Sequence, residues 1–215
     1  MRHVPHILVD PPWPEGALGL HPKRLHHLRR VLRLADGAPV AYTDGSGTVG
    51  EGVLAGDGVE RGIEVTVDRP RVRLTVAVAP PDSRDRQRFL IEKLSELGVE
   101  RIRWLDTRFG EGRPPSAGRS RQWADAALEQ SRGGWRTLVD EEPTNPGGLG
   151  GTVWAAEPGW PPPPPALGGL TLAIGPEGGW APGDLPAQLP RVGLGERVLR
   201  VETAAIVGAA LLLIR

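Results

Sequence analysis

The residues whose types and spacing could carry chemistry lie in two glycine-containing stretches near the C-terminus. The first, "LAIGPEGGWAPGDL" at 172–185, has the pattern of a strand running into a loop. A Walker loop needs a lysine and a hydroxyl after its last glycine, and neither follows Gly179. A Rossmann fingerprint needs three glycines at fixed spacing, which Pro176 and Glu177 fit poorly. The exposed amides and carbonyls of a stiff loop could instead recognise a neutral group such as an adenine edge, although a simple tight turn explains the same residues equally well.

The second stretch, "VGLGERVLRVETAAIVGAALLL" at 192–213, has a strand-like segment that reaches a glycine and then an apolar helix, expected over 203–214. Arg197, Arg200, Glu202 and Thr203 gather at the entrance of this helix. Thr203 could cap the helix, and Glu202 suits the positive end of its dipole. Taken alone, these residues are more typical of a capped, ion-paired helix start than of a catalytic site.

Composition excludes several classes of function. The chain has 215 residues, 39% hydrophobic and 24% charged, with a formal net charge of zero, so an anionic partner must be met by a local patch. Because cysteine is absent, disulfides, thiolate nucleophiles and cysteine-bound zinc are excluded. All five histidines precede residue 28 without a regular ligand spacing, and we expect no metal. The longest apolar run, 204–214, is too short to span a bilayer, and we expect a cytoplasmic protein with no membrane segment.

The first seventy residues predict a small β-rich unit. A helix is expected over 21–34, where apolar residues recur at helical spacing: Leu25, Leu28, Val31 and Leu32. Short β-branched runs separated by Asp-Gly and Gly-rich turns follow, a pattern typical of antiparallel strands in a small barrel.

A strand–helix–strand unit begins near residue 71. The strand at 71–81 ends in a double proline, and the helix after it places Phe89, Leu90, Leu94 and Leu97 on one face, with Gly98 as its stop. The strand that follows makes this a βαβ unit with parallel strands, so we predict an α/β fold with domains 1–70 and 71–215.

The rest of the second domain is expected to alternate loops, a helix and buried strands. We predict an arginine-rich loop over 108–121, a helix over 122–134 and a short buried strand over 153–157. The proline-rich connector at 158–169 cannot join a helix or a central strand, and the strand after it, 170–174, is expected to be central.

Together the two stretches resemble a known pair of motifs. "IGPEGGW" followed by "LGERVLRVETA" is similar to the paired motifs of the SPOUT methyltransferases, above all the RsmE type, which methylates N3 of a uridine in 16S ribosomal RNA. The resemblance extends to "HHLRRVLRLADGAPVAYTDGSG", "IEKLSELGVERI" and "QWADAALEQSRG", and so covers nearly the whole chain in order.

This resemblance implies a C-terminal SPOUT α/β domain with a deep trefoil knot and a PUA-like N-terminal β-barrel that binds RNA. It also implies S-adenosylmethionine as methyl donor, a homodimer with active sites at its interface, and 16S ribosomal RNA or the small ribosomal subunit as partner. The sulfonium of that donor is already activated, so the reaction requires no metal.

The chemistry of methylation at uridine N3 then indicates catalytic candidates, the two motif loops indicate the donor-binding residues, and the basic patches indicate RNA contacts. Arg200 is expected to hold the substrate or stabilise the uridine anion, and Glu202 to act as base or to position Arg200, with Glu177 a weaker candidate for base. The donor-binding residues are predicted to be Leu172, Ile174, Gly175, Pro176, Glu177, Gly178, Gly179, Leu194, Gly195, Arg197, Val198 and Leu199. The predicted RNA contacts are Lys23, Arg24, Arg29, Arg30, Arg113, Arg119 and Arg121.

The chain departs from the family pattern after the first strand of the second domain, where a basic residue is frequent. Here "PPDSRDRQ" offers Arg84, Arg86 or Arg88 in its place. Two alternatives stay open: a SPOUT enzyme that methylates a ribose 2′-hydroxyl, and a non-enzymatic RNA-binding or ribosome-assembly protein.

Overall fold

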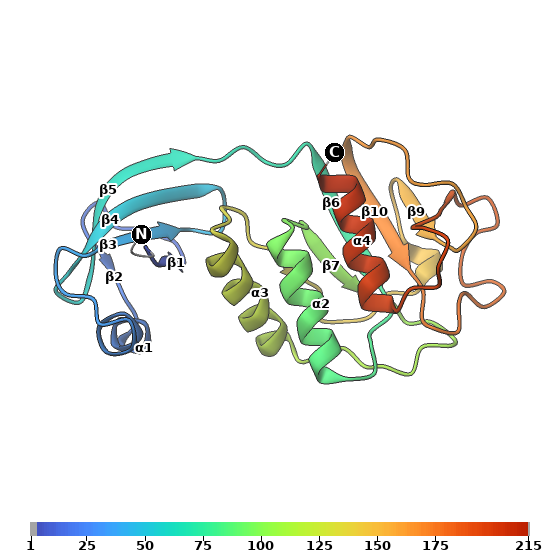
Figure 1. Cartoon of the computed structure of the whole chain (residues 1–215), viewed down its shortest axis with the longest axis horizontal. Helices are drawn as coiled ribbons and strands as arrows, with labels where there is room; N and C mark the ends of the chain where they lie inside the picture. The colour runs from blue at the N-terminus through green and yellow to red at the C-terminus, as the bar shows by residue number, and fades with distance from the viewer. Residues whose placement is uncertain (1–3, 215) are drawn as a thin grey trace. The chain divides into compact units, whose positions relative to one another are not determined.

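Residues 4–214 are described by a computed structural model, in which two units share the chain (Figure 1). The N-terminal unit contains the residues up to Arg69 together with Leu128–Arg136, and the C-terminal unit contains Pro70–Ala127 and the residues from Thr137 onward. The division falls beside the predicted boundary, but the inclusion of 128–136 was not foreseen. Backbone hydrogen bonds hold that segment, from Gly47 N to Gly134 O and from Arg136 N to Gly45 O, each 2.9 Å. Sequence patterns do not reveal such long-range pairing.

The N-terminal unit is built on a five-stranded sheet in the order β1-β3-β4-β5-β2. Strands β3, β4 and β5 pair antiparallel, as the turn pattern predicts, while β1 pairs parallel to β3. The strands are β1 (His6–Leu8), β2 (Leu18–Gly19), β3 (Pro39–Thr43), β4 (Thr48–Ala55) and β5 (Gly58–Thr66).

The predicted helix over 21–34 is shorter than expected and changes form. It begins as α1 (Pro22–His26) and continues as a π-helical turn, η1 (His27–Val31). Leu28 is buried in the core, but Val31 and Leu32 are 60% and 42% exposed, so the expected apolar face is only partly buried.

The C-terminal unit is built on a six-stranded parallel sheet in the order β11-β9-β10-β6-β7-β8. Its strands are β6 (Val72–Val78), β7 (Arg101–Trp104), β8 (Leu138–Val139), β9 (Val153–Ala156), β10 (Gly168–Ile174) and β11 (Arg191–Val192). The predicted βαβ unit is confirmed by the parallel pairing of β6 with β7, and β10 lies inside the sheet as predicted.

Helices α2 (Arg84–Glu96) and α4 (Val201–Leu213) pack against each other over one face of this sheet (Figure 1). Ser83 caps α2 by accepting a hydrogen bond from Arg86 N, and Gly98 follows its end with φ +78°, as expected of a glycine stop. The prediction for Phe89 is wrong: it is 47% exposed, while Leu90, Ile91 and Leu94 are fully buried. The buried face of α2 therefore includes Ile91 in place of Phe89.

Helix α3 (Ala117–Ser131) begins inside the segment predicted to be a loop. Its Trp123 and Ala124 pack into the core formed by the sheet, α2 and α4. The arginines at 119 and 121 therefore lie on a helix. The opposite face of the sheet is covered at β9 and β10 by loop residues, since Ala155 and Ala173 pack with Leu149, Leu185 and Leu189.

None of the helices in residues 4–214 is long and apolar enough to cross a membrane.

Candidate active site at the carboxyl ends of the parallel strands

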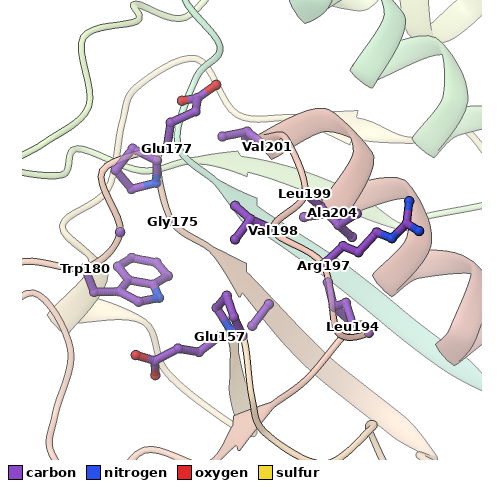
Figure 2. Close-up of a pocket in the computed structure, with 15 residues that line it drawn as sticks. Glu157, Gly175, Glu177, Trp180, Leu194, Arg197, Val198, Leu199, Val201 and Ala204 are labelled. Atoms are coloured by element: carbon purple, nitrogen blue, oxygen red, sulfur yellow. The ribbon is translucent and has the colours of Figure 1, made fainter.

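A cavity of about 200 Å³ opens at the carboxyl ends of β9, β10 and β11 (Figure 2). Three loops and the first turn of α4 line it, and the lining residues are Ala156, Glu157, Pro158, Gly175, Pro176, Glu177, Gly179, Trp180, Leu194, Gly195, Arg197, Val198, Leu199, Val201 and Ala204. Ligands of open parallel sheets bind in such crevices, because the loops that follow parallel strands meet at one edge. The position alone marks this cavity as a candidate binding site.

The two loops predicted from the glycine-containing stretches form much of the wall. Gly179 has a φ of +75° and Gly195 a φ of +128°, backbone conformations that residues with a side chain rarely adopt. A β-carbon on Gly175 would lie 3.0 Å from the Trp180 ring, so the absence of a side chain lets the indole lie against the loop. Glycine is therefore required here for both backbone conformation and close packing.

The wall is mainly apolar. Trp180 lines the cavity from the first motif loop and Val198 from the second, and Leu194, Leu199 and Ala204 add to the apolar lining (Figure 2). Such a surface suits a flat or aliphatic ligand with a few polar groups.

Glu157 brings a carboxylate to the cavity from the end of β9. It pairs with Arg191, with 3.5 Å between Arg191 Nε and Glu157 Oε2. Arg191 Nη1 is buried and has no hydrogen-bond partner among the described residues. The loose pair leaves Glu157 able to accept hydrogen bonds from a ligand.

An arginine lies among three carboxylates beside the cavity. Arg86 Nε donates to both oxygens of Glu202, at 3.1 Å each, and Nη2 donates to Glu202 Oε2 at 2.7 Å. Nη2 also donates to Glu177 Oε1 at 2.6 Å, and Nη1 donates to Asp82 Oδ1 at 2.9 Å. The guanidinium therefore joins the first turns of α2 and α4 to the loop after β10.

These contacts set the protonation of Glu202. Burial would raise the pKa of its carboxyl, but the hydrogen bonds and charge of Arg86, aided by the charge of Arg200, together hold that pKa below its usual value. The hydrogen bonds that Arg86 donates to Glu202, and then to Glu177, raise the pKa of Arg86. A carboxylate so stabilised in its charged form is a poor proton acceptor, so the geometry does not favour Glu202 as a general base. Its partner is also Arg86 and not Arg200, the residue that it was expected to position.

Arg200 stands at the N-cap of α4, with an exposed side chain that makes no capping hydrogen bond. The expectation that Thr203 caps this helix is wrong, because Thr203 lies within the first helical turn. Arg200 directly follows the second motif loop and is thus available to a ligand there.

Most of the predicted donor-binding residues are brought together by the cavity. Those that do not line it are Leu172, Ile174 and Gly178. Leu172 and Ile174 belong to the hydrophobic core, because the strand that carries the loop is itself buried. A β-carbon on Gly178 would lie 3.0 Å from the Phe109 β-carbon, so this glycine serves packing against the loop after β7.

Several lining residues were not identified from the sequence: Ala156, Glu157, Pro158, Trp180, Val201 and Ala204. A signal for the first three did exist, because 153–157 was predicted to be a buried strand and the carboxyl end of such a strand borders the crevice of a parallel sheet.

The predicted RNA contacts fall in both units. In the N-terminal unit Arg24 pairs with Glu129 and Arg29 with Asp36, at 2.6 Å each, whereas Lys23 and Arg30 are exposed. In the C-terminal unit Arg113 is exposed on the loop, and α3 carries Arg119 and Arg121, the latter 3.7 Å from Asp125. Within residues 4–214, no group of three or more His, Asp or Glu side chains is arranged to hold a metal ion.

Comparison with known proteins identifies the family. The sequence model of the RNA methyltransferase domain matches residues 68–145 and 163–213. The chain belongs to this family. The match includes both cavity loops and Arg86, but the segment 146–162, with β9 and Glu157, lies outside it.

Solved structures share the fold of this RNA methyltransferase over nearly its whole length. A ribosomal RNA small subunit methyltransferase E from Neisseria gonorrhoeae, bound to S-adenosyl methionine, is 21% identical, with a TM-score of 0.83 over 97% of this chain and 96% of that one. A probable rRNA-methyltransferase from Porphyromonas gingivalis is 24% identical, with a TM-score of 0.81 over 96% and 95%. A putative methyltransferase from Legionella pneumophila, in complex with the bound cofactor SAM, is 20% identical, with a TM-score of 0.78 over 97% and 96%. No curated protein sequence matches the chain.

Proposed function

We propose that this RNA methyltransferase transfers a methyl group from S-adenosylmethionine to N3 of a uridine in the 16S ribosomal RNA of the small subunit. The observation that carries the proposal is the cavity at the carboxyl ends of β9, β10 and β11, which is lined by both motif loops. The similar Neisseria and Legionella proteins have S-adenosylmethionine bound, and the Neisseria protein is named for the small-subunit RNA.

The cavity residues fit this donor. Backbone amides and carbonyls of Gly175–Gly179 and Leu194–Leu199 would meet the polar edge of adenine, while Trp180 and Val198 supply apolar walls for its faces. Glu157 would accept hydrogen bonds from the ribose hydroxyls. When bound, the donor supplies an activated methyl group on a sulfonium.

Arg200 would act on the substrate. Uridine N3 carries a proton that must leave before or during methyl transfer, and a cation close to the base stabilises the anion that results. Arg200 is exposed beside the second loop and can hold this position, whereas Glu202 is occupied by Arg86. In this proposal Arg200 binds the base and favours loss of its proton.

The wider architecture belongs to the same proposal. We infer that the N-terminal unit is a PUA-like barrel that binds RNA through Lys23 and Arg30, that the protein is a homodimer, and that it acts in the cytoplasm. We also infer a trefoil knot in the C-terminal unit. This inference is supported by the meeting of the two loops that the resemblance assigns to the knot, 175–179 and 194–199, at one cavity.

The test is methyl transfer to RNA followed by nucleoside analysis. The enzyme is incubated with S-adenosylmethionine and either unmodified 16S RNA or small subunits reconstituted from it, and the digested nucleosides are separated. The proposal predicts 3-methyluridine, which also arrests reverse transcriptase because N3 lies on the Watson–Crick edge. A 2′-O-methylated nucleoside would replace the proposed target with the ribose alternative. No methyl incorporation on either substrate would contradict the proposal and leave a binding protein.

A further inference from the structure

We propose that Arg86 is a positioning residue of the donor cavity, which holds the loop after β10 against α4 through Glu177. The inference rests on the proposed function, since it assigns a role in binding the methyl donor. Arg86 does not line the cavity, so its effect must pass through the residues that it contacts.

The guanidinium joins three segments that are far apart in the sequence. Asp82 precedes α2, Glu177 lies in the loop after β10, and Glu202 lies in the first turn of α4. The carboxylate of each accepts a hydrogen bond from the Arg86 guanidinium, at 2.9 Å, 2.6 Å and 2.7 Å respectively. Of the three, Glu177 lines the cavity.

The three carboxylates differ in exposure, and this difference assigns Glu202 and Glu177 different roles. The Glu202 side chain is 8% exposed and is held through both of its oxygens, so it fixes the guanidinium relative to α4. Glu177 and Asp82 are 54% and 69% exposed. Because ion pairs this exposed add little to folding stability, the Glu177 contact is better explained by positioning than by stability.

The loop after β10 needs such a tie. Its own hydrogen bonds, from Gly179 N to Pro176 O and from Ala181 N to Asp184 Oδ2 (2.9 Å each), are local to the loop. Gly178 packs against Phe109, but Gly179 is exposed with open space around it, and a glycine leaves the backbone many conformations. The bond from Arg86 to Glu177 restricts this loop before the donor arrives, which lowers the entropic cost of binding.

An arginine is required for this geometry. Its planar fork presents five N–H donors in fixed directions, so it grips the Glu202 carboxylate and still reaches Glu177. A lysine carries the same charge at a single point and would pair with the buried Glu202. Arg86→Lys should therefore keep the ion pair with Glu202 and lose the contact with Glu177.

The experiment is calorimetric titration of the full chain with S-adenosylhomocysteine for the wild type, Glu177→Gln, Arg86→Lys and the double variant. Each single variant should raise Kd about three- to fivefold, the range expected for one partly exposed ion pair. The double variant should be no weaker than either single one, because both remove the same contact. Asp82→Asn is the matched control: it removes an exposed carboxylate of the same arginine that does not line the cavity, and Kd should be unchanged.

Two further readouts separate positioning from a structural or chemical role. Thermal unfolding of Glu177→Gln and Arg86→Lys should match the wild type. In the methyl-transfer assay Glu177→Gln should raise KM for the donor and leave kcat at saturating donor unchanged. Unchanged Kd in both single variants, additive effects in the double variant, or a lower kcat with unchanged KM would each overturn the proposal. If the wild type itself bound no S-adenosylhomocysteine, the proposed function would fail instead.

Discussion

Replacement of Arg86 by methionine should destabilise the C-terminal unit, because it leaves the Glu202 carboxylate buried without its partner. Removing one member of a buried ion pair costs about 3–5 kcal/mol. The Arg86 side chain is 24% exposed, so water can partly solvate the site and the expected loss is about 3 kcal/mol. For a chain of this size, that loss lowers the unfolding midpoint by about 6–12 °C.

Urea unfolding at pH 7, followed by the fluorescence of buried tryptophans such as Trp104 and Trp123, measures the free energy of unfolding. The double variant Arg86→Met/Glu202→Leu should recover most of the loss, since removing both charges leaves none buried. Glu202→Leu alone measures how the apolar side chain changes the free energy of unfolding while Arg86 is retained.

The pH dependence of the free energy of unfolding provides a second test. In the wild type the pKa of Glu202 lies below its ordinary value, so its contribution to stability is present above the unfolded-state pKa and lost as pH falls through the folded one. Without Arg86, burial would be the largest influence on that pKa and would raise it against the charge of Arg200, so the Arg86→Met variant would regain stability as acid protonates Glu202. The difference in the free energy of unfolding between the Arg86→Met variant and the wild type should therefore become smaller from pH 7 to pH 5. A difference below about 1 kcal/mol at pH 7, with no gain in the double variant, would refute the reasoning.

The remaining predictions concern the second motif loop and RNA. Gly193→Ala should destabilise the chain by about 1–3 kcal/mol in the same urea assay, because the new β-carbon would lie 1.8 Å from the backbone oxygen of Trp160; an unchanged midpoint would contradict the packing. Arg200→Ala should leave folding and Kd for S-adenosylhomocysteine unchanged and lower kcat about 100-fold, whereas wild-type turnover would reject its role. Lys23→Ala and Arg30→Ala should each reduce the slope of log K for RNA against log salt by about 1 in a filter-binding titration, and an unchanged slope would remove that residue from the interface.

Local patterns in the sequence predicted the elements near the site well. The double proline after β6, the glycine after α2 and the alternating apolar residues of β10 each report a strand end, a helix end or a buried strand within a few residues. The donor-binding candidates themselves came from the family resemblance, and most of them meet at the cavity because parallel strands place the loops that follow them at one edge of the sheet.

Features that depend on distant residues could not be predicted in this way. Phe89 fits the apolar stripe of α2 in sequence, yet tertiary packing selects Ile91 instead. The partner of Glu202 is Arg86, more than a hundred residues earlier in the chain, and only the arrangement of α2 beside α4 brings the two together. The sequence analysis named Arg84, Arg86 and Arg88 as candidates for the basic residue of this region. In the structure, Arg86 is the one of the three that pairs with Glu202.

Calorimetric titration of the purified chain with S-adenosylhomocysteine tests donor binding at the cavity most directly. A matched pair of variants makes the result specific: Gly179 lines the cavity and Gly183 does not, while both have positive φ and open space at the β-carbon position. Saturable binding that is lost in Gly179→Val and retained in Gly183→Val is the predicted result. Absence of binding by the wild type at millimolar ligand, or equal binding by all three proteins, would contradict a donor site at the carboxyl ends of β9, β10 and β11.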